Sequence, residues 1–207
     1  MTLLLPGAEG APAGTKSART RQRILDSAAQ VFRQEGIMAR LADIATAAGM
    51  QTGSLYYHFT GRDDLIEEVL RLGVERSWDH VRAELAALPV EATPAQRLET
   101  AVRAHAGAIL ELSDYCAANS RMFSVAAPEV RERHYHLQQA YGTFFHQLIV
   151  DAVASGELRP GTDPNVVRML LFGAMNFMSD WYRPDSGRSA DQVIEDLVAM
   201  VFRGLLA

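Results

Sequence analysis

Apolar residues recur at helical spacing along almost the whole chain. The first such stretch places Ile24, Leu25, Ala28, Val31 and Phe32 on the 3.6-residue period of an amphipathic helix, and Gly36 ends it. The same spacing recurs over residues 41–48 and from about residue 63 to residue 74. No stretch shows the strict apolar and polar alternation of a half-buried strand. The pattern predicts an all-α fold.

A tight glycine turn joins two short helices near the N-terminus. Residues 41–48 are followed by Gly49, which can adopt the left-handed conformation that ends a helix. A third helix is expected from about residue 51 to residue 59, with Met50 packed between the two. Two short helices joined in this way after a longer one form a helix-turn-helix, whose second helix enters the major groove by its N-terminal residues.

The stretch QTGSLYYHFTGRDDL, residues 51–65, is rich in groups that can bind DNA. Small residues at its start let the backbone approach base edges, and their hydroxyl groups can bond to bases. The ring hydroxyls, the imidazole and a following arginine can reach DNA phosphates. Such contacts fix the position of a protein along the duplex. The alternative is a polar-tipped amphipathic helix on the surface. The candidate contacts here are Thr52, Gly53, Ser54, Tyr56, Tyr57, His58 and Arg62.

The charge is distributed unevenly along the chain. The 207 residues carry a net charge of −5, which by itself is unfavourable for a nucleic-acid binder. Between Lys16 and Arg62, however, seven basic residues stand against three acidic ones. A basic N-terminal region on an acidic body indicates an anionic partner at one end of the molecule. The alternative is an ordinary local fluctuation of charge.

Composition narrows the setting of the protein. Cys116 is the single cysteine, so no internal disulfide is possible and the reducing cytoplasm is the expected location. Residues 1–15 are expected to form a disordered tail, because Pro6 and Gly7 interrupt an apolar run too short for a signal peptide. No stretch approaches the roughly 20 apolar residues of a membrane helix. We therefore expect no membrane association.

Residues 19–70 resemble the DNA-binding domain of the tetracycline-repressor (TetR) family. The resemblance rests on ILDSAAQVFRQEG, DIATAAGM and GSLYYHFTGRDDLIEEVL. It implies a dimeric repressor that binds a double-stranded DNA operator, with a helix-turn-helix head over residues 16–62 and a helical effector-binding and dimerisation body over residues 63–207. It also implies that Leu55 and Phe59 pack inside the head, that residues 52–54 face the groove, and that Tyr56, Tyr57, His58 and Arg62 face phosphates.

Three positions depart from the family pattern. The link from Gly36 to Ile44 is one residue shorter than usual. Arg40 stands where a Thr or Ser normally caps the second helix, a loss of roughly 1 kcal/mol, and Gln51 replaces the usual cap of the third. Arg40 can project into solvent or contact a phosphate, and we prefer the phosphate contact.

The body is expected to contain five more helices after the fourth. One carries a stripe of Leu98, Val102, His105, Ile109 and Leu112. A break near SDYCAANS precedes a short helix over about residues 121–126, and a long helix runs from Pro128 to about Ser155. Gly156 and Asp163 suit a C-cap and an N-cap before a helix that is apolar nearly all round and therefore buried on several sides. The resemblance implies a dimer interface of the last two helices, with Val193, Leu197 and Val201 in it.

Several polar and aromatic residues of the body suit an effector site. A buried polar group must be hydrogen-bonded, so His105 and Asn176 need either a protein partner or a ligand. WYRP at residues 181–184 resembles TetR-family regulators that respond to acyl-CoA thioesters, although a neutral hydrophobic effector is the alternative. The candidate effector residues are His105, Met122, Phe123, Tyr141, Phe145, Phe172, Asn176 and Arg183.

The competing functional classes lack support in the sequence. His134, His136 and His146 have no metal-ligand spacing, and Cys116 has no signature of a nucleophile. We therefore expect neither catalysis, nor a metal, nor a cofactor. A helical dimeric protein without DNA binding is the other alternative, and it would leave Tyr56, Tyr57 and His58 unexplained.

Overall fold

The computed structural model describes residues 16–185 and 187–205, and these contain nine α-helices and no strand. The prediction of an all-α fold is confirmed, whereas the expected tail at residues 1–15 lies outside the described residues. A short 3₁₀ turn follows the first and sixth helices, and a π-helical turn, Ala108–Leu112, follows the fifth. The α-helices are α1 (Lys16–Glu35), α2 (Leu41–Ala47), α3 (Thr52–Leu55), α4 (Arg62–Ala87), α5 (Pro94–Gly107), α6 (Asp114–Met122), α7 (Pro128–Ala154), α8 (Pro164–Trp181) and α9 (Ala190–Leu205).

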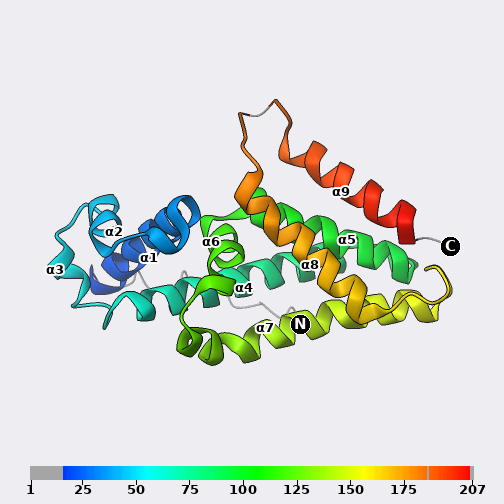
Figure 1. Cartoon of the computed structure of the whole chain (residues 1–207), viewed down its shortest axis with the longest axis horizontal. Helices are drawn as coiled ribbons and strands as arrows, with labels where there is room; N and C mark the ends of the chain where they lie inside the picture. Colours follow the sequence, from blue (N-terminus) through cyan, green and yellow to red (C-terminus); the bar gives the residue numbers. More distant parts are fainter. Residues whose placement is uncertain (1–15, 186, 206–207) are drawn as a thin grey trace, which may run out of the picture.

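The helices form a small head and a larger body. Helices α1, α2 and α3 lie together at one end of the molecule, and α4 runs from them into the body (Figure 1). Helix α6 lies where the two parts meet and packs on both α1 and α4. The remaining helices, α5, α7, α8 and α9, build the far end.

The head has its own apolar core. Ile24 and Phe32 of α1 and Ile44 of α2 are fully buried in it. Leu55 and Phe59 are buried in the same cluster, so the prediction that both pack inside the head is confirmed. The first half of α4 and one face of α6 complete the cluster. Helix α4 packs in both the head and the body. The domain boundary expected between residues 62 and 63 therefore stays a prediction.

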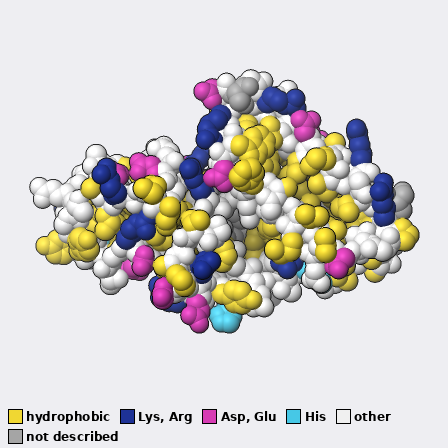
Figure 2. Space-filling view, viewed as in Figure 1, with side chains coloured by type: hydrophobic (Ala, Val, Ile, Leu, Met, Phe, Trp, Pro, Cys, Tyr) yellow, Lys and Arg dark blue, Asp and Glu magenta, His cyan; other side chains and the backbone are white. Residues whose placement is uncertain are grey.

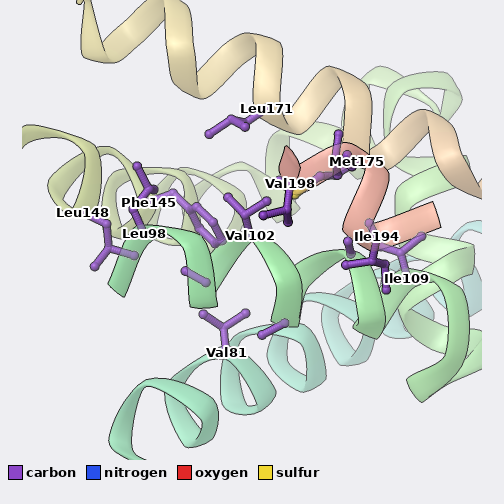
Figure 3. Packing of buried hydrophobic residues seen from close by; sticks show 14 of the residues in the cluster. Val81, Leu98, Val102, Ile109, Phe145, Leu148, Leu171, Met175, Ile194 and Val198 are labelled. Carbon is purple, nitrogen blue, oxygen red and sulfur yellow. The ribbon is translucent and has the colours of Figure 1, made fainter. Parts of the chain in front are cut away.

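A second core fills the body. It is formed by the second half of α4 together with α5, α7, α8 and α9. Figure 3 shows Val102 of α5 beside Val198 of α9 and near Phe145 of α7, with Leu171 of α8 above them in the same cluster. The stripe expected from Leu98 to Ile109 contributes its apolar side chains here, whereas Leu112 at its end is exposed. The body is thus held by burial of apolar stripes from five helices.

The helix ends follow the sequence signals. Gly49 has φ +64° and Gly156 has φ +78°, so both adopt the left-handed conformation that ends a helix. The carboxylate of Asp163 accepts the backbone N–H groups of Asn165 at 2.8 Å and Val166 at 3.3 Å. It therefore caps α8 as predicted.

The expectation for α6 was wrong. The structure has a helix over Asp114–Met122, where a break was expected, and only a 3₁₀ turn over Phe123–Val125. Ser113 caps this helix by accepting the N–H of Cys116. Gly73 of α4 lets α6 approach closely, because a Cβ there would lie 2.4 Å from the Tyr115 carbonyl oxygen. Packing against α4 and the N-cap at Ser113 stabilise this helix, although its apolar residues follow the helical period only weakly.

The expectation that α8 is buried on several sides was also wrong for the single chain. Val167, Leu171, Met175 and Met178 face the core, but the opposite face is exposed. The exposed apolar side chains of that face are Val166, Met169, Leu170, Phe177 and Trp181. We call this surface the α8 face; hydrophobic side chains are visible along α8 in Figure 2. No helix in the described ranges has the length and apolar character needed to span a membrane.

Candidate functional site

The segment that carries the candidate DNA contacts is more compact than expected. The α-helix is limited to Thr52–Leu55, and the remainder of the expected helix over residues 51–59 is a hydrogen-bonded turn. In that turn the N–H groups of His58 and Phe59 donate to the Leu55 carbonyl at 2.9 and 3.0 Å. Because Leu55 and Phe59 are buried, they fix which side of the segment faces solvent.

The residues between these two anchors form an exposed edge. Tyr57 is 87% exposed and Tyr56 is 58% exposed, values far above those of a packed aromatic ring. Gly53 is also exposed, and an added Cβ there would meet no atom within 4 Å. Thr52, Ser54 and His58 are partly exposed beside them. The fold therefore presents all six predicted contact residues of this segment at the surface.

The two arginines proposed as phosphate contacts have partners within the head. The Arg40 guanidinium donates to both carboxylate oxygens of Asp43, at 2.8 and 3.0 Å. This hydrogen-bonded pairing lowers the pKa of Asp43 below its usual value. Asp43 also accepts the backbone N–H of Arg40 at 3.3 Å, which satisfies one donor at the start of α2 despite the missing cap. Arg40 remains exposed.

Arg62 has a role that the sequence did not indicate. Its guanidinium donates to the carbonyls of Ile37 at 2.7 Å and Ala39 at 3.2 Å. It thereby ties the loop between α1 and α2 to the first residue of α4. In this structure Arg62 stabilises the head, and its phosphate contact stays a prediction.

A cavity of about 590 Å³ opens between α7 and α8. Its wall mixes aromatic rings with amide side chains and includes one arginine. The lining residues are Phe123, Tyr135, Gln138, Gln139, Tyr141, Gly142, Thr143, His146, Asn165, Arg168, Met169, Phe172 and Asn176. We call it the α7–α8 cavity.

A polar triad adjoins the α7–α8 cavity: Tyr141 and Asn176 line it, and His105 is buried behind them. Nδ1 of His105 lies 2.9 Å from the Tyr141 hydroxyl, and Nε2 lies 3.3 Å from the Asn176 side-chain oxygen. Burial lowers the pKa of His105 to about 4, so the ring is neutral at pH 7. The neutral ring accepts from Tyr141 and donates to Asn176. The protein thus satisfies both ring nitrogens, while the amide nitrogen of Asn176 has no hydrogen-bond partner in the described part of the chain.

Aromatic rings pack around this triad. The centroid of the Phe172 ring lies 5.1 Å from that of His105, and the Phe145 centroid lies 5.7 Å away, both edge-on. Such edge-to-face geometry is favourable between aromatic rings. Phe145 is fully buried behind the cavity wall, whereas Phe172 lines it.

The other proposed effector residues divide between different places. Phe123 lines the α7–α8 cavity, but Met122 is fully buried in the head cluster, because it points from α6 toward α1 and α4. Arg183 lies at a separate cavity of about 270 Å³, where the end of α8 meets α1. The cation beside the aromatic wall is instead Arg168.

Most of the polar lining was not identified from the sequence. Tyr135, Gln138, Gly142 and His146 recur every three or four residues, which places them on one face of α7. That spacing was visible in the sequence. What it could not show is that α8 stands opposite this face and leaves space there.

Helix α6 links the α7–α8 cavity wall to the head. Ser120 donates to the Asn176 carbonyl at 2.8 Å. One residue further along, Arg121 donates to the carbonyls of Arg33 at 2.7 Å and Gln34 at 3.0 Å, at the end of α1. Tyr115, at the other end of α6, donates to Asp26 at 2.8 Å. A shift of α8 therefore has a short hydrogen-bonded path to α1.

The apolar surface available to a second copy differs from the expected one. Leu197 is only 8% exposed because α9 packs on α5 of its own chain, which leaves little of this side chain for a partner, and its assignment to a dimer interface stays a prediction. Val193 and Val201 are partly buried against the same core. Several exposed apolar side chains lie on the α8 face, with Leu170 at 69% and Phe177 at 62% exposure, and Met200 of α9 is 69% exposed as well.

His134, His136 and His146 are not drawn together by the fold. Among residues 16–185 and 187–205, no group of three or more His, Cys, Asp or Glu side chains could hold a metal ion. His134 is buried beside the Phe123 ring, whereas His146 lines the α7–α8 cavity.

Comparison with known proteins agrees with this architecture. Residues 24–69 match the family described as bacterial regulatory proteins, tetR family, and residues 91–205 match the tetracyclin repressor-like, C-terminal domain. The chain is 27% identical over 196 residues to the HTH-type transcriptional repressor KstR2 of Mycolicibacterium smegmatis, which covers 92% of this chain and 93% of that protein.

Two solved structures share the fold over most of the chain. AibR in complex with isovaleryl coenzyme A and operator DNA aligns with a TM-score of 0.78 at 21% identity, covering 88% of this chain and 98% of that one. The ketosteroid regulator KstR2 of Mycobacterium tuberculosis aligns with a TM-score of 0.75 at 23% identity, covering 94% and 98%. The chain belongs to the TetR family of bacterial regulatory proteins.

Proposed function

We propose that the protein is a one-component transcriptional repressor that acts in the cytoplasm and is released from an operator by a small hydrophobic effector. The observation that carries the DNA-binding role is the exposed edge formed by α3 and the turn after it, where Tyr56 and Tyr57 project between the buried anchors Leu55 and Phe59. Exposed rings are unfavourable on a surface that has no partner. Their hydroxyl groups suit phosphates, and Gly53 and Ser54 suit close approach to base edges.

A homodimer supplies two heads for a palindromic operator. The α8 face is the surface that supports this assembly, because a contiguous exposed apolar patch marks an interaction site. A twofold dimer uses the same patch on both copies. The recognition segments must then lie about 34–36 Å apart to enter successive major grooves.

The effector acts through helix α6. A ligand in the α7–α8 cavity contacts Asn176, whose carbonyl accepts the Ser120 hydroxyl on α6. Helix α6 in turn holds the end of α1 through Arg121. An effector that binds more tightly to the conformation with displaced heads shifts the population away from the DNA-bound state.

The effector class follows from the wall of the α7–α8 cavity. Aromatic side chains and Met169 favour an apolar body, and the free amide nitrogen of Asn176 can donate to an oxygen of the ligand. An acyl-CoA is the first candidate, since AibR binds isovaleryl coenzyme A in a fold of this kind. A neutral apolar metabolite is the alternative.

Fluorescence anisotropy with DNA from upstream of the protein's own gene tests the proposal. Specific operators are typically bound 10³- to 10⁷-fold more tightly than unrelated DNA. Binding to the upstream DNA with no more affinity than to a scrambled duplex would contradict the DNA-binding role. A saturating effector should lower operator affinity by about 5- to 150-fold, the usual range of allosteric coupling.

A further inference from the structure

Arg168 is an unpaired cation in the wall of the α7–α8 cavity. It lies on α8, is only partly exposed, and has neither a hydrogen bond nor an ion pair with any residue that the structure describes. Its guanidinium approaches α7 at Gly142, where an added Cβ would lie 3.1 Å from Nη1. The missing side chain at Gly142 therefore gives the guanidinium its position beside the cavity.

The rest of the α7–α8 cavity leaves this charge without compensation. None of the thirteen described residues that line it is an Asp or Glu, and Arg168 is the single Lys or Arg among them. The other polar groups are neutral amides and hydroxyls, together with His146. A cation held beside a partly enclosed cavity favours an opposite charge, because a paired charge there is less costly than an isolated one.

The second cavity offers an internal comparison. It has three arginines, but Arg33 forms an ion pair with Asp114 at 2.8 Å and Arg121 with Asp180 at 3.6 Å. These arginines already have carboxylate partners and serve the junction between α1, α6 and α8. The arginine that has no carboxylate partner and also adjoins the aromatic wall is Arg168.

We propose that the effector is an amphipathic anion whose carboxylate or phosphate group binds the guanidinium of Arg168, while its apolar part packs on Phe172 and Tyr141. The inference rests on the proposed effector role of the α7–α8 cavity and defines the chemistry of the ligand. The planar fork of an arginine binds either anion through two parallel hydrogen bonds. The free amide nitrogen of Asn176 then faces an uncharged oxygen of the same ligand.

Isothermal titration calorimetry of the full-length protein without DNA tests this assignment. The probes are dodecanoate, dodecanoyl-CoA and methyl dodecanoate, with the same three forms of a fused-ring steroid acid. At least one anionic form should bind about 10- to 100-fold more tightly than its methyl ester, as expected for hydrogen bonds to a charged group. Preference for the carboxylate identifies a free acid as the ligand, and preference for the thioester identifies the phosphates of CoA.

Variants test whether Arg168 is the source of the preference for anions over esters. Arg168→Gln should remove it, and Arg168→Lys should keep only part of it, because an ammonium lacks the planar fork. Arg97→Gln on α5 removes the same charge away from the α7–α8 cavity and should leave the preference unchanged. Melting temperatures of all three variants show that they are folded.

Three outcomes would overturn the assignment. The first is equal affinity for the esters and the anions. The second is an anion preference that survives Arg168→Gln, or that is lost in Arg183→Gln instead. The third is no binding by any probe. Operator affinity measured on the same preparations is independent of all three. If any of the three outcomes is found while the protein still binds its operator, the anion site is rejected and the DNA-binding role stays in place.

Discussion

Replacing Gly73 with alanine tests the close packing of α4 on α6. A Cβ built at Gly73 would lie 2.4 Å from the Tyr115 carbonyl oxygen and 2.6 Å from Cβ of Asn119. Both distances are shorter than van der Waals contact, and the nearer one involves backbone that cannot rotate away. The two helices must therefore separate or shift to admit one methyl group.

The magnitude follows from two opposing effects. Alanine in a helix interior is favoured over glycine by roughly 0.5–1 kcal/mol. Forcing a methyl group into a packed contact typically costs about 1–3 kcal/mol, occasionally more. The net expectation is a loss of about 1–2 kcal/mol in the free energy of unfolding, or roughly 2–8 °C in melting temperature for a chain of this size.

Thermal and urea unfolding measure the loss, with Gly107→Ala as the matched control. Gly107 also lies in a helix, α5, but its nearest neighbour to an added Cβ is Ile194 at 4.0 Å, an ordinary contact. That substitution should be neutral or stabilising by about 0.4–1 kcal/mol. A Gly73→Ala protein as stable as the wild type, with Gly107→Ala unchanged or stabilised, would refute the packing described for α6.

Three further predictions address the buried histidine, the DNA contacts and the dimer. The pKa of His105 is about 4 when folded and about 6.5 when unfolded, so its contribution to stability is complete above pH 6.5 and is lost as the pH falls toward 4. Between pH 8 and pH 5 the loss is about 2 kcal/mol, and urea unfolding of His105→Gln should show a pH dependence flatter by that amount. Tyr57→Phe should weaken binding to specific and unrelated DNA alike, because phosphate contacts carry no base information; a loss confined to the operator, or an equal loss for Tyr182→Phe in the body, would contradict that contact. Glu at both Leu170 and Phe177 should produce folded monomers in sedimentation that no longer bind the operator, and a dimer that persists would place the interface elsewhere.

The sequence by itself determined the fold class and most helix ends. These features depend on local chemistry: the apolar period, the left-handed glycines at Gly49 and Gly156, and the cap at Asp163 act within a few residues of their own position. The placement of Leu55 and Phe59 in the interior came from the resemblance to the TetR family, and the structure confirms it.

Tertiary structure decided which surfaces are shared between helices. Helix α6 forms because Gly73 and small residues allow it to dock on α4, a contact between segments about 40 residues apart. The apolar stripe of α9 is used within its own chain, so Leu197 is buried and the α8 face remains exposed. Arg62 is held by carbonyls of a distant loop, and Arg168 lies against Gly142 of α7 without an ion-pair partner among the described residues. Periodicity identifies which residues are apolar, but only the packing of helices decides which neighbour covers them and which charge is left without a partner.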